Sequence, residues 1–164
     1  MTYNKDNMAK IPEDTIRISN EFKTRFNQLI DESDLSLKDF SKAVNVSMPV
    51  LRLASNFGII PSVRILIKIC DYCDLSLDYL LGHTKENEFL KSNAPSSFHD
   101  RYIILRDEKG VKDSQIANVM PFTKTHISEW KRCHTLPSID YLLSLADYFE
   151  VSIDFLLGRT DIKK

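Results

Sequence analysis

Residues 114–132, SQIANVMPFTKTHISEWKR, carry the clearest structural pattern of this chain. It predicts two short helices, roughly Asp113–Met120 and Thr123–Cys133, that meet in a tight turn. Small Ala117 allows the two helices to cross closely. We expect burial of the apolar residues around the crossing, Ile116, Phe122, Ile127 and Trp130. The stretch therefore predicts a helix-turn-helix.

The second of these helices presents a polar face. If positions 122, 127 and 130 are buried, the residues turned outward are Lys124, Thr125, His126, Ser128, Glu129, Lys131 and Arg132. Residues 123–134 carry three Lys or Arg against one Glu, a local charge of +2, although the whole chain has a net charge of −1. An amphipathic helix with such a face can enter the major groove of DNA. A solvated surface helix is the plainer alternative.

The pattern occurs twice along the chain. A shift of 76 residues superimposes 22–84 on 98–160 without a gap, and 16 of the 63 aligned positions are identical. An internal repeat of this kind indicates two copies of one structural unit. Each copy predicts five helices and shows no sustained strand alternation, so we predict an all-α fold.

The repeat also predicts the domain organisation. We expect a flexible N-terminal arm at 1–18, a first domain at 19–84, a linker at 85–97 and a second domain at 98–160. The linker ends in a cluster of Ser, Asn and Pro, which is typical of flexible connections.

The first copy departs from the second in its third helix, within VSMPVLRLASNFG at 46–58. The repeat register turns four apolar residues outward there: Met48, Pro49, Val50 and Leu53. Only Arg52, Ser55 and Asn56 remain as polar residues that could contact DNA. An exposed apolar face suits a protein contact better than a DNA contact.

The cysteines do not predict a metal site. Three Cys is an odd number, which favours reduced thiols over disulfides. Cys70 and Cys73 have CxxC spacing, but no second ligand pair accompanies them. The repeat aligns them with Ala146 and Phe149, so we expect a structural role. We expect no cofactor, no metal and no catalytic group, and therefore no enzyme.

Apolar runs are too short to span a bilayer, and residues 1–18 lack the apolar centre of a signal peptide. We therefore expect a cytoplasmic protein with no membrane partner.

Both copies resemble the lambda-repressor-like, or XRE/Cro-type, helix-turn-helix domains of phage and bacterial regulators. In the second copy the matching motifs are QIA, ISEWKR, LPS, LLSLADYFEVS and DFLLGRT. The resemblance implies two tandem five-helix domains, each with a third helix that reads base edges. The turn of that family usually carries Gly. Here Asn45 tolerates a left-handed backbone whereas Pro121 cannot adopt one, so we expect the two turns to differ.

We expect a sequence-specific transcriptional regulator of the repressor type that binds double-stranded DNA. Base contacts are expected from Lys124, Thr125, His126 and Ser128. Phosphate contacts are expected from Ser114, Gln115, Lys131, Arg132 and Thr135. Thr123, which begins the reading helix, is a further DNA-binding candidate, and Arg52 is the DNA-binding candidate of the first copy.

The alternative is a protein-interaction adaptor or antitoxin-like module with little DNA binding. Under either hypothesis we expect the first copy to provide an assembly surface that contacts a second chain or a partner protein, formed by Met48, Pro49, Val50 and Leu53. For a DNA-binding protein, a homodimer and an internal pseudo-dimer of the two copies both remain open.

Overall fold

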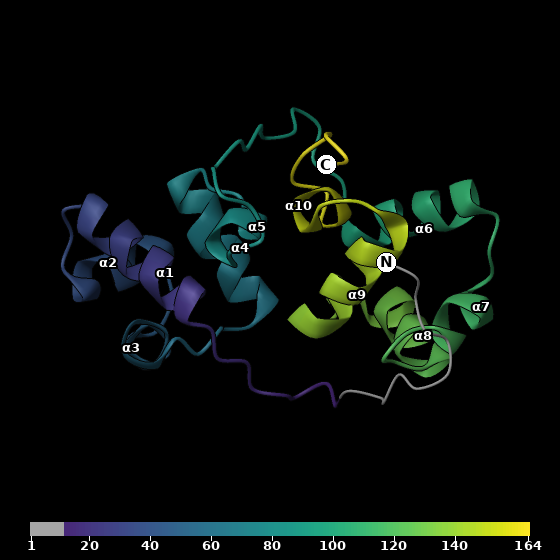
Figure 1. Ribbon diagram of the computed structural model, residues 1–164, viewed down its shortest axis with the longest axis horizontal. Helices are drawn as coiled ribbons and strands as arrows, with labels where there is room; N and C mark the ends of the chain where they lie inside the picture. Colours follow the sequence, from purple (N-terminus) through teal and green to yellow (C-terminus); the bar gives the residue numbers. More distant parts are fainter. Residues whose placement is uncertain (1–11) are drawn as a thin grey trace. The chain divides into compact units, whose positions relative to one another are not determined.

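In the computed structural model, which describes residues 12–164, the regular elements of the described chain are ten helices and no strand (Figure 1). One isolated bridge joins Ile18 to Ile59. The predicted all-α class is confirmed. The chain divides into a first compact unit, Ile16–Phe89, and a second unit that comprises Leu90–Lys164 and residues 12–15.

Each unit contains five helices. Those of the first unit are α1 (Asn20–Glu32), α2 (Leu37–Val44), α3 (Met48–Phe57), α4 (Val63–Cys73) and α5 (Leu77–Leu80). Those of the second unit are α6 (Phe98–Lys109), α7 (Asp113–Asn118), α8 (Lys124–Cys133), α9 (Ile139–Phe149) and α10 (Ile153–Leu156). None of these helices combines the length and apolarity needed to cross a membrane.

The 76-residue shift found in the sequence also relates the backbones of the two units. Helices α3, α4 and α5 begin and end 76 residues before α8, α9 and α10. Left-handed residues recur at the same spacing, in the pairs Asp34 and Gly110, Gly58 and His134, Asp74 and Glu150, and Gly82 and Gly158. Because such residues commonly end helices, the repeat fixes where the helices stop as well as which faces are buried.

The turn between the second and third helices is where the two units differ. In the first unit Asn45 ends α2 with φ 54° and ψ 51°. Its counterpart Pro121 has a ring that fixes φ near −65°. In the second unit α7 stops at Asn118, and Val119 caps it with φ −111°. The helix is therefore two residues shorter than the expected span to Met120, and the expected difference between the turns is confirmed.

Aromatic side chains form the centre of each core. In the first unit Phe22, Phe26 and Phe40 are fully buried. In the second unit Phe122 and Trp130 pack edge to face, with ring centroids 4.9 Å apart. All five residues predicted at the α7–α8 crossing are buried: Ile116, Ala117, Phe122, Ile127 and Trp130.

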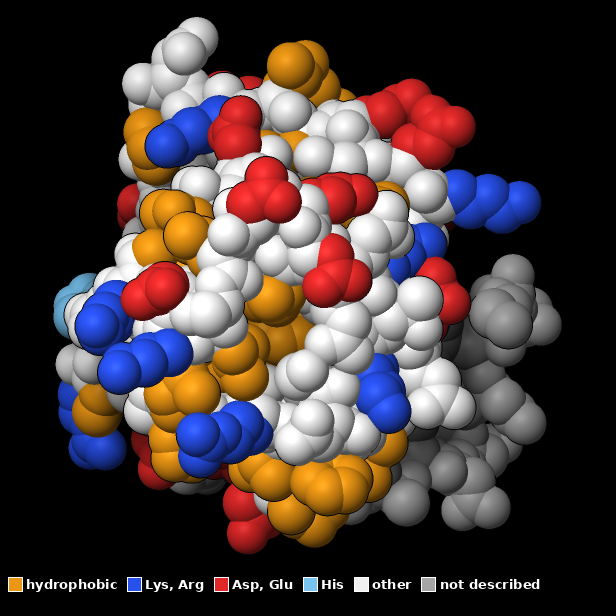
Figure 2. Space-filling view, turned by 90° about the vertical axis from the view of Figure 1, so that its left-hand side faces the viewer, with side chains coloured by type: hydrophobic (Ala, Val, Ile, Leu, Met, Phe, Trp, Pro, Cys, Tyr) orange, Lys and Arg blue, Asp and Glu red, His pale blue; other side chains and the backbone are white. Residues whose placement is uncertain are grey.

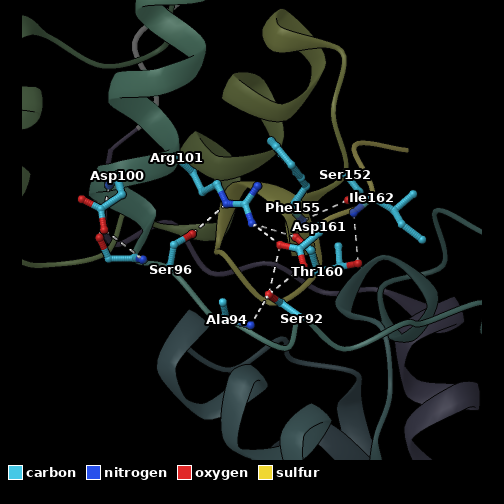
Figure 3. A network of polar contacts seen from close by, with 11 residues as sticks. Ser92, Ala94, Ser96, Asp100, Arg101, Ser152, Phe155, Thr160, Asp161 and Ile162 are labelled. Atoms are coloured by element: carbon cyan, nitrogen blue, oxygen red, sulfur yellow. Dashed lines mark hydrogen bonds and ion pairs between the residues drawn. The ribbon is translucent and has the colours of Figure 1, made fainter.

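An arginine on the first helix anchors the end of each unit. Arg101 on α6 donates to the Thr160 carbonyl at 3.2 Å and lies over the Phe155 ring at 4.1 Å (Figure 3). The equivalent Arg25 donates to the Thr84 carbonyl at 2.6 Å and lies over Tyr79 at 4.3 Å. The motif that ends each copy, DYLLGHT or DFLLGRT, thus folds back onto the first helix of its own unit.

The second half of the expected linker is bound to the second unit. The Ser92 amide donates to the Arg159 carbonyl at 2.8 Å, and the Ser96 amide donates to the Gly158 carbonyl at 3.3 Å. The Ser92 hydroxyl also contacts the Asp161 carboxylate, as Figure 3 shows. Residues 92–96 are therefore part of that unit, in contrast to the free connection expected over 85–97.

The structure also differs in part from the flexible N-terminal arm that we expected over residues 1–18. Residues 1–11 of that span lie outside the described residues. The Arg17 carbonyl accepts from the Ile60 amide at 2.9 Å, and the Ser19 amide donates to the Gly58 carbonyl at 2.9 Å. From Arg17 onward, therefore, the backbone is hydrogen-bonded to the first unit.

Candidate nucleic-acid interface

The start of α8 is fixed by Thr123 and His126. The Thr123 amide donates to Nδ1 of His126 at 3.1 Å, and the Thr123 hydroxyl lies 2.9 Å from the same nitrogen. Because Nδ1 accepts from the amide, Nε2 carries the proton of the neutral ring. The ring also meets Tyr141 of α9 edge to face, with centroids 5.3 Å apart. His126 therefore caps the helix and packs on α9.

The inner face of α8 is anchored in the aromatic core. Ile127 and Trp130 are 1% and 2% exposed. The Trp130 ring packs against Phe98 of α6, against Phe122 and against Tyr141. This confirms the expectation that Trp130 is a core residue, since no face of the ring is left for stacking on a base.

The outer face of α8 and its surroundings are polar. The expected contact residues that are exposed on α8 are Lys124, Thr125, Ser128 and Arg132, and Glu129 is exposed beside them. Those exposed nearby are Ser114, Gln115, Thr123 and Thr135. His126 and Lys131 are half-buried. The fold thus gathers the ten candidates of the second copy on α7, α8 and the segments that flank them.

Some of these polar groups already have partners within the chain. The Gln115 side chain accepts from the Lys112 amide at 2.8 Å, which caps α7. The Ser128 hydroxyl donates to the Lys124 carbonyl at 3.1 Å. A DNA contact by either side chain would therefore have to share or replace an existing hydrogen bond.

Lys131 takes part in a charged network at the α7–α8 crossing. Its ammonium group contacts the Asp113 carboxylate, which also accepts from the Tyr102 hydroxyl at 2.9 Å and from Arg106 at 3.2 Å. Burial alone would raise the pKa of Asp113, but the hydrogen bonds from Lys131, Tyr102 and Arg106 outweigh it and hold the pKa below its ordinary value. Lys131 is thus engaged in holding the fold.

A surface pocket of about 410 Å³ lies beside this network. Its lining residues are Arg106, Asp107, Val111, Lys112, Asp113, Ser114 and Lys124. Sequence reasoning did not single out Arg106 or Lys112. Both come close to α8 only because α6 and α7 pack beside it, which no local pattern indicates.

The matching helix of the first unit, α3, has a different surface. Of the four residues expected to face outward, Pro49 is exposed and Leu53 is 43% exposed, whereas Met48 and Val50 are half-buried. Arg52 is exposed, as expected. Phe57 is 61% exposed and was not among the expected surface residues. Its counterpart in the repeat, Cys133, is exposed as well.

Apolar and charged side chains alternate over this part of the first unit. Figure 2 views the side drawn at the left of Figure 1, and apolar atoms are exposed there between Lys, Arg, Asp and Glu side chains. On α3 itself, the exposed residues are both apolar and polar: Pro49, Leu53 and Phe57 beside Arg52 and Asn56.

None of the three cysteines forms a disulfide in the described part of the chain. Cys70 is buried, and burial raises the pKa of half-buried Cys73 to about 11. Among residues 12–164, no three His, Cys, Asp or Glu side chains are grouped so that they could hold a metal ion.

The geometry of α8 therefore provides one chemical capability, which is binding through exposed hydroxyl and cationic groups on a rigidly anchored helix. Its N-terminus is fixed by the Thr123–His126 contact and its inner face by Trp130. Comparisons of the chain with protein-family models, with curated proteins and with solved structures found no match.

Proposed function

We propose that this chain is a sequence-specific DNA-binding regulator of the repressor type, in which α8 enters the major groove. The observation that carries the proposal is the contrast between the two faces of α8. Ile127 and Trp130 are fixed in the core, while Lys124, Thr125 and Ser128 are exposed on the opposite side. A recognition helix needs this combination, because base contacts require a rigid helix that projects polar groups.

Phosphate contacts would come from cations around this face. Arg132 is exposed in the last turn of α8, and Lys112 and Lys124 line the pocket beside α7. Charge on a few well-placed side chains supplies most non-specific affinity for DNA. The net charge of −1 therefore does not oppose the proposal, since the relevant charge is local.

Base contacts would come from the first two turns of α8. Thr125 and Ser128 can bond to any base, and Lys124 suits the acceptor groups of guanine. His126 is half-buried and already caps the helix, so it would contribute less to base recognition than Lys124 or Thr125.

Binding to a random-sequence duplex, measured by fluorescence anisotropy over a range of salt concentrations, tests the proposal. Arg132→Ala should weaken binding and reduce the slope of log affinity against log salt by about 0.9 if one phosphate contact is lost. Arg64→Ala, on the exposed surface of α4, is the matched control and should change neither. Equal slopes for both variants would exclude phosphate contact by Arg132.

Sequence preference needs a separate measurement. After selection of bound duplexes from a random pool, Thr125→Ala should lose about 1–3 kcal/mol of discrimination at one base position. An unchanged preference would mean that α8 does not read bases at Thr125.

A second candidate function, protein contact through the first unit, is favoured by exposed Leu53 and Phe57 on α3. A second copy of the chain docked there would give a homodimer that presents two α8 helices to a near-palindromic site. Leu53→Lys combined with Phe57→Lys should lower the mass measured by light scattering. Leu90→Lys, which changes another exposed apolar residue, should not. A wild-type monomer would rule out the homodimer.

A further inference from the structure

The acidic segment Pro12–Thr15 lies within the second unit, although it precedes the first unit in the sequence. It forms a turn in which the Thr15 amide and hydroxyl donate to the Pro12 carbonyl at 3.2 and 2.7 Å. The turn contains two adjacent carboxylates, Glu13 and Asp14, both exposed. One of these two carboxylates, that of Glu13, lies next to His126 of α8.

Glu13 lies beside the proposed reading helix. Its Oε2 is 3.9 Å from Nε2 of His126, in the first turn of α8. Since Nδ1 of His126 accepts from the Thr123 amide, the nitrogen that faces Glu13 is the one that carries a proton. The carboxylate therefore faces the positive end of the N–H dipole of the neutral ring.

Tyr141 gives a second sign of the same proximity. Burial raises the pKa of Tyr141 above its ordinary value, and the carboxylates of Glu13, Asp140 and Asp14 raise it further. Tyr141 is the α9 residue on which the His126 ring packs. The negative charges of Glu13 and Asp14 thus both influence Tyr141, the residue through which α9 contacts His126 of α8.

We propose that the acidic segment is an autoinhibitory element that competes with DNA for the N-terminal half of α8. This rests on the proposed function. Phosphates approaching Lys124 and Thr125 would bring negative charge to the helix end next to Glu13 and Asp14. Like charges at this range repel, so the segment has to leave before α8 can enter a groove. The affinity for DNA is then reduced by the fraction of chains in which the segment is bound.

The test uses the full chain with Glu13→Gln and Asp14→Asn combined, which removes both charges and keeps the side-chain shapes. Binding to a random-sequence duplex at low salt should tighten roughly fivefold or more, the lower range of an intramolecular coupling. The matched control is Asp31→Asn with Glu32→Gln, an exposed pair at the end of α1 that changes net charge equally. It should leave the affinity within about twofold of wild type, because it removes the same net charge from a helix of the first unit and not from the segment beside His126.

A measurement without DNA separates this proposal from the proposed function. Nuclear magnetic resonance should show shifts of the Thr123–Ile127 amides and the His126 ring in the Glu13/Asp14 variant and not in the control. Unshifted signals would overturn the contact itself. Shifted signals with an affinity equal to that of the control would overturn the competition. Shifted signals with no DNA binding by any chain would overturn the proposed function, and autoinhibition with it.

Discussion

Lys131 of α8 and Asp113 of α7 form an ion pair across the helix crossing. Tyr102 and Arg106 of α6 donate hydrogen bonds to the same carboxylate, at 2.9 and 3.2 Å. One acidic side chain therefore links three helices. The orientation of the proposed reading helix depends on this carboxylate as well as on the aromatic core.

Asp113→Asn should destabilise the protein by about 1–3 kcal/mol, because it leaves a half-buried Lys131 without its charge partner and weakens two hydrogen bonds. Urea unfolding measures this loss. Asp107→Asn is the control, since Asp107 is exposed and pairs with Arg106 only at the surface, where ion pairs contribute little. Equal losses for the two variants would contradict a special role for Asp113.

The Asp113 carboxylate should also make the stability of the folded protein depend on pH in the acid range. The folded-state pKa of Asp113 lies below its ordinary value of 3.8, so its contribution to stability is complete above pH 3.8. It is lost as the pH falls from there through the lower folded-state value. Wild type should lose more stability than Asp113→Asn in that window, and parallel pH profiles would argue against the depressed pKa.

His99 predicts a second pH effect, nearer neutrality. Its Nε2 is the one buried side-chain nitrogen or oxygen without a hydrogen-bond partner in the described chain, and its ring lies 5.2 Å from that of His134. Burial lowers the pKa of His99, and the neighbouring His134 lowers it further. The unfolded chain therefore binds a proton at higher pH than the folded chain.

Stability should thus decline as the pH falls below the ordinary value of 6.5. His99→Phe should flatten the stability profile between neutral pH and pH 5, measured by thermal unfolding. His83→Gln, which changes a histidine of the first unit that lies 3.6 Å from the Asp78 carboxylate, should not flatten that part of the profile. An identical slope in all three chains would remove His99 as its source.

Substitutions at Asn45 and Pro121 should differ in their effect on stability, because only the turn at Asn45 contains a left-handed residue. Asn45→Ala should cost about 1–2 kcal/mol, since a Cβ is strained at positive φ and the amide side chain that eases this strain is lost. Asn45→Gly should cost much less. Pro121→Ala should not reproduce the Asn45→Ala loss, because the turn that contains Pro121 has no left-handed residue. Chemical denaturation compares the three variants.

The thiols should react in a fixed order with an alkylating reagent. Exposed Cys133 should react first, and Cys73, whose pKa is about 11, should react slowly because little thiolate is present at neutral pH. Buried Cys70 should react only on unfolding. Mass spectrometry of the labelled peptides gives the order. Stoichiometric zinc in the purified protein, lost on replacement of Cys70 and Cys73, would contradict the structural role of both.

The local structure of this protein can be predicted from its residues alone. Apolar periodicity gave the helices, and Ser97 and Gly110 marked the ends of α6. The apolar pattern of residues 114–132 predicted which residues at the α7–α8 crossing are buried, and Asn45 and Pro121 predicted that the two turns differ. These features depend on backbone preference and on burial within a few turns of helix, so neighbouring residues suffice to predict them.

Contacts between residues far apart in the sequence became visible only in the folded chain. Lys131 looked like a free surface cation in the sequence, yet the crossing angle of α7 and α8 brings it to Asp113. Ser92 looked like part of a free linker, yet its amide binds the Arg159 carbonyl. No pattern linked Glu13 to His126, which are 113 positions apart. Such contacts follow from the three-dimensional path of the chain, because an ion pair or hydrogen bond depends on distance in space and leaves no periodic trace in the sequence.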